Sequence, residues 1–101
     1  MADKKFRFAI LTRFKKLLSE RGVYSDINIY SQQWAADAMI ESYGYDETLD
    51  AIEYYFSVSS SPDWTWFTYN SDKVIQSKRA EEEDKRVRAK MRAKAKEWLE
   101  S

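Results

Sequence analysis

Glycine and proline are almost absent from this chain, with two glycines and one proline among 101 residues. An all-β domain of this size needs turn residues between many short strands, and so few glycines and prolines cannot supply them. The scarcity of both residues therefore predicts a helical protein. We expect an all-α fold, consisting of a small four-helix domain with a long, charged, partly protruding C-terminal helix.

The chain also lacks cysteine and histidine. This excludes disulfides, thiolate zinc sites, cysteine nucleophiles, Ser-His-Asp triads and haem ligation by histidine. A glycine-rich phosphate loop, a dinucleotide fingerprint and a nucleophile elbow are also missing. The carboxylates of Asp46, Glu47, Asp50 and Glu53 lie close along one predicted helix, where helix N-terminal charge and solvation explain them. We expect no enzyme activity, no cofactor and no metal.

Apolar spacing and capping residues predict the first two helices. The first runs from about Lys4 to Arg21, and Gly22 ends it because glycine readily adopts the left-handed conformation. Ser31 is the expected N-cap of the second helix, which should run through Tyr43 and stop at Gly44. Asp46 is the expected N-cap of the third.

The sequence Ser61-Pro62-Asp63 combines a capping hydroxyl, a first-turn proline and a carboxylate, and predicts a helix beginning at Pro62. We expect one continuous helix from Pro62 to Ser101, with two helices bent between Ser71 and Ser77 as the alternative. Residues 1–76 should form a compact domain with an aromatic core, and residues 77–101 a charged helical extension. The expected core includes Leu49, Ile52, Phe56, Trp64 and Phe67.

Charge is distributed unevenly although basic and acidic residues balance at 17 each. Residues 1–21 carry seven basic and two acidic side chains, whereas residues 22–76 carry one basic and nine acidic ones. Residues 77–101 carry nine basic and six acidic side chains. Such asymmetry indicates charged partners.

Cations are densest near the C-terminus, where seven of them lie between Lys85 and Lys96 with no acid among them. On a helix this segment is about 17 Å long, and its cations suit several phosphates without reading base sequence. Pairing with the preceding acids, as in Glu81–Lys85, Glu82–Arg86 and Asp84–Arg88, is expected in the same helix. The alternative is a charged, solvated helix face without a partner. The candidate nucleic-acid-binding residues are Lys85, Arg86, Arg88, Lys90, Arg92, Lys94 and Lys96, with Arg13 and Lys16 of the first helix.

A narrow apolar stripe follows the same C-terminal segment. It consists of Ala80, Val87, Met91 and Trp98, and Asp84 and Lys94 interrupt it at positions where a strict heptad needs apolar residues. So thin a stripe suits a two-helix seam, and a homodimer through this helix is one expected partner. It is too narrow for a membrane-surface helix, which presents a broad apolar face, so no membrane partner is expected.

Aromatic residues concentrate between Tyr24 and Tyr69, which contain twelve of the sixteen. Most are expected in the core. Consecutive positions of a helix point in different directions, however, so we expect Trp66 and Tyr69 to be partly exposed when their neighbours face inward. Trp66, Tyr69 and Trp98 are therefore the candidate protein-binding residues, since exposed aromatics often anchor interfaces. A stacking platform for single-stranded nucleic acid is disfavoured because the rings lie in the acidic part of the chain.

The aromatic segments 54–56 (YYF) and 61–73 (SPDWTWFTYNSDK), followed by a charged helical tail, resemble small proteins encoded in tailed-phage genomes. The resemblance covers about a third of the chain and carries over no functional residue. It implies an accessory or inhibitor role, since some of those proteins are linked to DNA replication or to interference with host machinery.

These observations predict a non-enzymatic accessory protein that binds nucleic acid through basic helices, with a role in DNA replication as one setting. The alternative is a protein-binding module or small inhibitor that presents its acidic, aromatic surface to a host or phage protein. The longest apolar run is only Phe8–Leu11, which is too short for a signal-peptide core or a membrane span. We therefore expect a cytoplasmic protein.

Overall fold

The computed structural model describes residues 3–100, and within this range all regular structure is helical. The all-α prediction is confirmed, with five helices in place of the expected four. The helices are α1 (Lys4–Glu20), α2 (Gln33–Tyr43), α3 (Tyr45–Val58), α4 (Trp64–Tyr69) and α5 (Ser71–Glu100).

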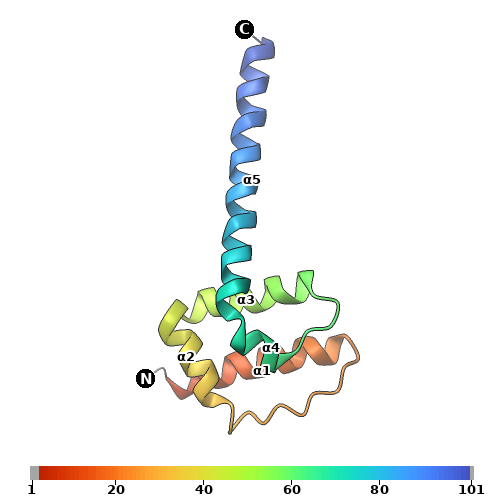
Figure 1. Cartoon of the computed structure of the whole chain (residues 1–101), viewed down its shortest axis with the longest axis vertical. Helices are drawn as coiled ribbons and strands as arrows, with labels where there is room; N and C mark the ends of the chain where they lie inside the picture. Colours follow the sequence, from red (N-terminus) through yellow and green to blue (C-terminus); the bar gives the residue numbers. More distant parts are fainter. Residues whose placement is uncertain (1–2, 101) are drawn as a thin grey trace.

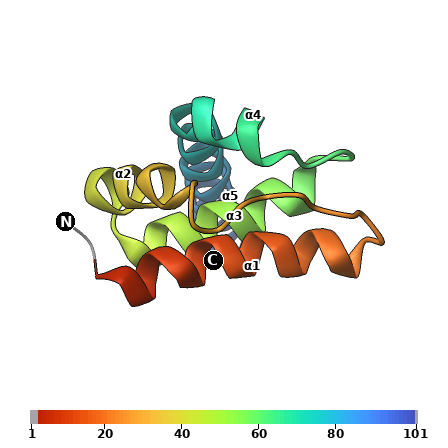
Figure 2. The ribbon, with the colours of Figure 1, turned by 90° about the horizontal axis from the view of Figure 1, so that it is seen from below.

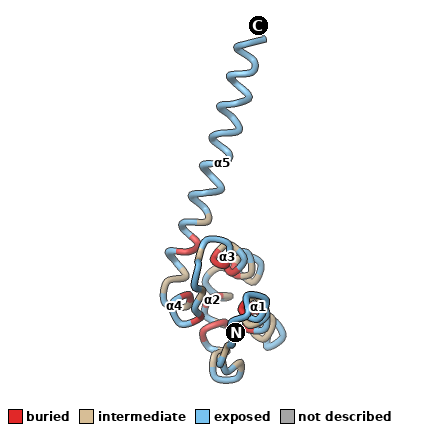
Figure 3. Tube along the Cα trace, turned by 90° about the vertical axis from the view of Figure 1, so that its right-hand side faces the viewer, coloured by how far each residue is buried: buried red, intermediate tan, exposed pale blue. Residues whose placement is uncertain are grey.

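Four of the helices and the base of α5 form a domain, from which the rest of α5 projects as a rod (Figure 1). The molecule measures 61 × 32 × 20 Å, and its radius of gyration is 17.4 Å, against about 13 Å for a compact chain of this length. Burial ends near the base of α5, where Val74 and Ile75 are buried and Lys78 is half-buried (Figure 3). Every residue from Arg79 to Glu100 is exposed. We call residues 79–100 the tail.

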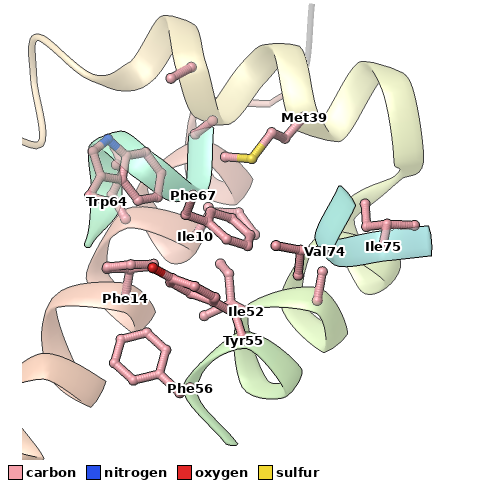
Figure 4. Packing of buried hydrophobic residues seen from close by; sticks show 14 of the residues in the cluster. Ile10, Phe14, Met39, Ile52, Tyr55, Phe56, Trp64, Phe67, Val74 and Ile75 are labelled. Carbon is pink, nitrogen blue, oxygen red and sulfur yellow. The ribbon is translucent and has the colours of Figure 1, made fainter. Parts of the chain in front are cut away.

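The core lies where α1 and α3 run side by side, with α2, α4 and the base of α5 covering them (Figure 2). Phe14 of α1 is fully buried, and its ring lies 4.8 Å from that of Phe56 and 5.1 Å from that of Trp64, centroid to centroid. Phe67 is also fully buried, 5.7 Å from Phe14 (Figure 4). Ile52, Phe56, Trp64 and Phe67 are buried as predicted, whereas Leu49 packs half-buried at the edge.

Two glycines end helices as predicted. Gly22 has φ of 74° and Gly44 has φ of 88°, in the region that favours glycine. Gly44 also forms the N-cap of α3, so the predicted cap at Asp46 is wrong and Asp46 lies in the first turn. The predicted cap at Ser31 is wrong too, because Gln32 caps α2 while the Ser31 hydroxyl donates to the Asn28 carbonyl at 3.3 Å.

The expected helix from Pro62 to Ser101 is interrupted, and it starts two residues later. Asp63 is the N-cap of α4, with its Oδ2 accepting a 2.8 Å bond from the Trp66 amide. Asn70 separates α4 from α5, with φ of −119° and ψ of 19°. Its side-chain Nδ2 donates to the Trp66 carbonyl at 2.9 Å, so the amide side chain supplies a hydrogen-bond donor to a carbonyl in the last turn of α4. The break lies just before the 71–77 interval proposed for the alternative bend.

Candidate nucleic-acid interface

A cluster of ionic contacts at the base of the tail joins α5 to α3. Glu47 of α3 accepts a 3.1 Å hydrogen bond from Arg79 Nε and lies 3.9 Å from Lys78 Nζ. Lys78 also pairs with Glu82 at 3.0 Å. The hydrogen bond to Glu82 is the main cause that raises the pKa of Lys78, and nearby Glu47 raises it further while partial burial opposes the shift. These contacts hold the first exposed turn of α5 against the domain.

Tyr54 of α3 lies beside the next turn of α5. Burial raises the pKa of its phenol, and the neighbouring carboxylate of Glu81 raises it further because a negative charge disfavours the phenolate. The contact between α3 and α5 therefore extends to residue 81, beyond which only the tail's own residues support the helix.

Two of the expected ion pairs within the tail are present. Lys85 Nζ lies 3.6 Å from Glu81 Oε1, and Arg88 Nη2 lies 3.1 Å from Asp84 Oδ2. The side chains of both cations are about two-thirds or more exposed, at 74% and 68%. Pairs this exposed contribute only a few tenths of a kcal/mol, so they leave both cations accessible to a stronger anion.

The third expected pair is replaced. Arg86 Nη2 lies 3.6 Å from Glu83, one turn away at i−3, whereas Glu82 points back to Lys78 at the base of the tail. Glu82 is drawn to Lys78 because that ammonium is half-buried among further carboxylates. The position of Lys78 at the base of the tail thus determines that Arg86 pairs with Glu83 and not with Glu82.

The remaining four tail cations have no ion-pair partner among residues 3–100: Lys90, Arg92, Lys94 and Lys96. At about 100° of rotation per residue, the seven cations form two groups along the helix. Lys85, Arg88, Arg92 and Lys96 lie within about 80° of arc at spacings of three, four and four residues. We call these four residues the cation stripe, whereas Arg86, Lys90 and Lys94 form the second group, of which Lys94 also interrupts the apolar stripe.

The cations of α1 do not extend the cation stripe. Arg13 Nε donates to Glu53 Oε1 at 2.6 Å, so its guanidinium is engaged within the domain. Lys16 is exposed, and it lines an open cavity of about 510 Å³ together with Arg13, Asp50 and Glu53. α1 lies on the side of the domain away from the tail (Figure 1). The structure therefore does not bring Arg13 and Lys16 together with the tail cations, and carboxylates of α3 surround them.

The apolar stripe of the tail is open to solvent along its length. Val87 is 44% exposed, Met91 66% and Trp98 84%. Leu99, which the sequence interpretation did not select, is 88% exposed beside Trp98. The tail therefore combines an exposed apolar stripe with the cation stripe on one of its flanks.

The aromatic candidates Trp66 and Tyr69 line different hollows. Trp66 is half-exposed and stacks on Tyr55, with ring centroids 5.4 Å apart and an interplanar angle of 9°. It walls an open groove of about 540 Å³ between α3, α4 and the base of α5, which Tyr54 and Lys73 also line. Tyr69 is 81% exposed and lines a smaller hollow with Trp34 of α2.

Trp34 was not among the predicted binding residues, although its ring is 64% exposed. The spacing of Ala35 and Met39, four residues apart on the buried face of α2, is a signal in the sequence, because it places Trp34 about 100° from Ala35 and off that face. The exposed aromatic surface is thus wider than the one expected.

Within residues 3–100, no three acidic, histidine or cysteine residues gather in a way that could hold a metal ion. No helix in the same range has the length and apolar character needed to cross a membrane. Comparison with protein-family models, with curated proteins and with solved structures gives no significant match.

Proposed function

We propose that the protein is a non-enzymatic accessory protein that binds the phosphate backbone of nucleic acid through the tail of α5. The observation that carries the proposal is the cation stripe, four cations aligned over about 17 Å of a helix that projects from the domain. Two of them, Arg92 and Lys96, have no ion-pair partner among residues 3–100. The setting proposed for this activity is DNA replication, to which some of the small phage proteins with similar aromatic segments are linked.

The accessibility of the stripe supports this function. Arg79 to Glu100 are all exposed, so a nucleic acid strand can approach the stripe without displacing any part of the domain. Binding of phosphates releases counterions, which supplies a favourable, sequence-independent free energy. Trp98 is the one aromatic residue among residues 79–100, so contacts to the backbone, rather than stacking on successive bases, account for binding.

A titration of fluorescent single-stranded and duplex DNA at several salt concentrations tests the proposal. Four phosphate contacts predict that the logarithm of the binding constant for duplex falls with the logarithm of salt concentration at a slope of about −3.6. Substituting Arg92→Gln and Lys96→Gln together should reduce this slope to about −1.8. Both positions are exposed, so circular dichroism should show unchanged helix content.

The matched control is the double variant Lys4→Gln and Lys5→Gln on α1, which removes the same charge from an exposed position at the far side of the domain. The control should keep the wild-type slope. An equal reduction of the slope in both double variants would mean that net charge alone attracts DNA, which contradicts the proposal. An absence of DNA binding by the wild-type protein at low salt would refute it.

A second candidate function is binding of a protein partner at the groove beside Trp66. The observation that favours it is the half-exposed indole, held rigidly against Tyr55 in the wall of an open groove of about 540 Å³. Exposed, preorganised aromatic rings commonly carry much of an interface's binding energy. Trp66→Ala should abolish capture of such a partner and leave DNA binding unchanged. The double variant Arg92→Gln and Lys96→Gln should weaken DNA binding and leave capture of the partner unchanged.

A further inference from the structure

The exposed apolar stripe of the tail follows a heptad pattern with spacings of three and four residues. Assigning its residues to positions a and d places two charged residues, Asp84 and Lys94, in the same seam. In order along the chain the seam contains Ala80, Asp84, Val87, Met91, Lys94 and Trp98. None of these six side chains is covered by the domain.

The residues of this seam match those of a second copy that runs in the opposite direction. If two tails run antiparallel about an axis beside Ala89, each a position faces a d position of the second copy. Asp84 then faces Lys94 of the second copy, Val87 faces Met91, and Ala80 faces Trp98. Every layer thus joins opposite charges, two apolar side chains, or a small residue and a large one.

A parallel arrangement lacks this complementarity. Positions a and d would then face their own equivalents, placing Asp84 against Asp84 and Lys94 against Lys94 within the seam. Like charges in a seam are destabilising. The parallel pair gains Glu83–Arg88 contacts at the flanks, but exposed pairs of this kind contribute only a few tenths of a kcal/mol each.

We propose that this face is covered by a second copy of the chain, so that two tails pair as an antiparallel coiled coil centred on Ala89. The exposed part of the helix fits this arrangement. In this register Glu100 of one copy lies opposite Lys78 of the other, so the exposed residues 79–100 of the two copies face each other.

The ionic environment of Asp84 is compatible with the pairing. Its carboxylate already holds Arg88 of the same helix at 3.1 Å, and it remains about half-exposed. A carboxylate has about four acceptor sites, so it can accept Lys94 of the second copy without releasing Arg88. Lys94 has no ion-pair partner among residues 3–100, so its ammonium is available for the contact.

The flanks oppose the pairing and keep it weak. Arg88 would lie near Arg88 of the second copy on one side of the seam, and Lys90 near Lys90 on the other. The first of these arrangements places both cation stripes on one face of the pair. The pairing does not depend on the proposed nucleic-acid function, but it would join two stripes of four cations into one surface.

Sedimentation equilibrium of the full chain without nucleic acid, from about 10 µM to about 1 mM, tests the pairing. We expect a reversible monomer–dimer equilibrium in this range. Asp84→Lys should raise the dissociation constant at least about tenfold, because each seam then holds two Lys–Lys contacts. Lys94→Asp should do the same through Asp–Asp contacts, although it changes the net charge in the opposite direction.

The double variant Asp84→Lys and Lys94→Asp restores opposite charges in the seam and should return the dissociation constant to within about threefold of the wild-type value. Glu100→Lys is the matched control, since it changes the charge as Asp84→Lys does but lies on the outer face of the helix. A purely monomeric chain at about 1 mM, or a dimer insensitive to the charge exchange, would overturn the proposal.

Disulfide formation tests the orientation, because the natural chain contains no cysteine. In the antiparallel register, mixing Val87→Cys and Met91→Cys proteins under mild oxidation should give mainly the mixed disulfide between the two variants. Ala93→Cys, on the outer face, should give little. Predominant homodimers of each variant would indicate parallel tails and refute the antiparallel seam.

Because both experiments omit nucleic acid, their failure would leave the DNA-binding result unaffected.

Discussion

The domain and the tail are both helical, yet different interactions hold them. In the domain, α1, α2 and α3 bury their apolar faces against one another, so tertiary packing determines where each helix lies. Every residue of the tail is exposed, and beyond its first turn, which Arg79 joins to Glu47 of α3, the helix rests on alanine propensity and on ion pairs one turn apart. A substitution in the domain should therefore change global stability, whereas a substitution in the tail should change local order and binding.

Phe14→Ala should have the largest effect on stability. The Phe14 ring is fully buried and contacts the rings of Phe56, Trp64 and Phe67, so its removal leaves a cavity at the centre of the core. We expect the free energy of unfolding to fall by about 3–5 kcal/mol, measured by urea denaturation. Met91→Ala removes a large apolar side chain from the tail and should cost less than about 0.5 kcal/mol in the monomer. Similar losses in both variants would contradict the division between domain and tail.

Asp63→Ala should have the next largest effect. The carboxylate caps α4 through its bond to the Trp66 amide, and loss of such a cap costs about 1 kcal/mol. Ser61→Ala is the control, because Ser61 was the cap predicted from sequence and its hydroxyl caps no helix in the structure. Thermal denaturation should separate the two variants. If Ser61→Ala proves the more damaging, then α4 begins where the sequence predicted.

Particular residues explain which parts of the fold could be predicted. The ends at Gly22 and Gly44 were predicted correctly because a left-handed backbone favours one residue type. A continuous helix was favoured over the alternative bend between Ser71 and Ser77, because the residues around Asn70 keep helical spacing and contain neither glycine nor proline. The backbone of Asn70, with φ of −119° and ψ of 19°, and the bond from its side chain to the Trp66 carbonyl mark the end of α4, and both are matters of geometry that spacing does not encode.

The candidate site was predictable in part for a similar reason. Charge runs in the tail are local in sequence, so two ion pairs one turn apart were found correctly. Arg13 was assigned to nucleic acid, but it pairs with Glu53, forty residues later. A contact between residues so far apart depends on how α1 packs on α3, and helical periodicity contains no information about that partner.

Ala89→Gly should affect only the tail. Glycine costs about 1 kcal/mol relative to alanine within a helix, and Ala89 makes no contact that would spread this loss to the domain. Amide hydrogen exchange in the surrounding turns should accelerate about fivefold, while the urea midpoint stays unchanged. Ala51→Gly is the matched control in α3, where the alanine is fully buried, and it should shift the midpoint. A shifted midpoint for Ala89→Gly would show that the tail contributes to the cooperative unit.

The smallest expected effect concerns Lys78, which lies where the domain meets the tail. Its pKa is raised in the folded protein, chiefly by the hydrogen bond to Glu82, so folding favours the charged ammonium. The resulting stabilisation is complete below the ordinary value of 10.5 and is lost as the pH rises through the higher folded-state value. Measured between about pH 9 and about pH 12, wild-type stability should therefore fall more steeply than that of Lys78→Gln. Lys90→Gln, which removes a cation without an ion-pair partner among residues 3–100, should follow the wild-type curve. Parallel curves for wild type and Lys78→Gln would mean that the ammonium does not help to hold the tail against α3.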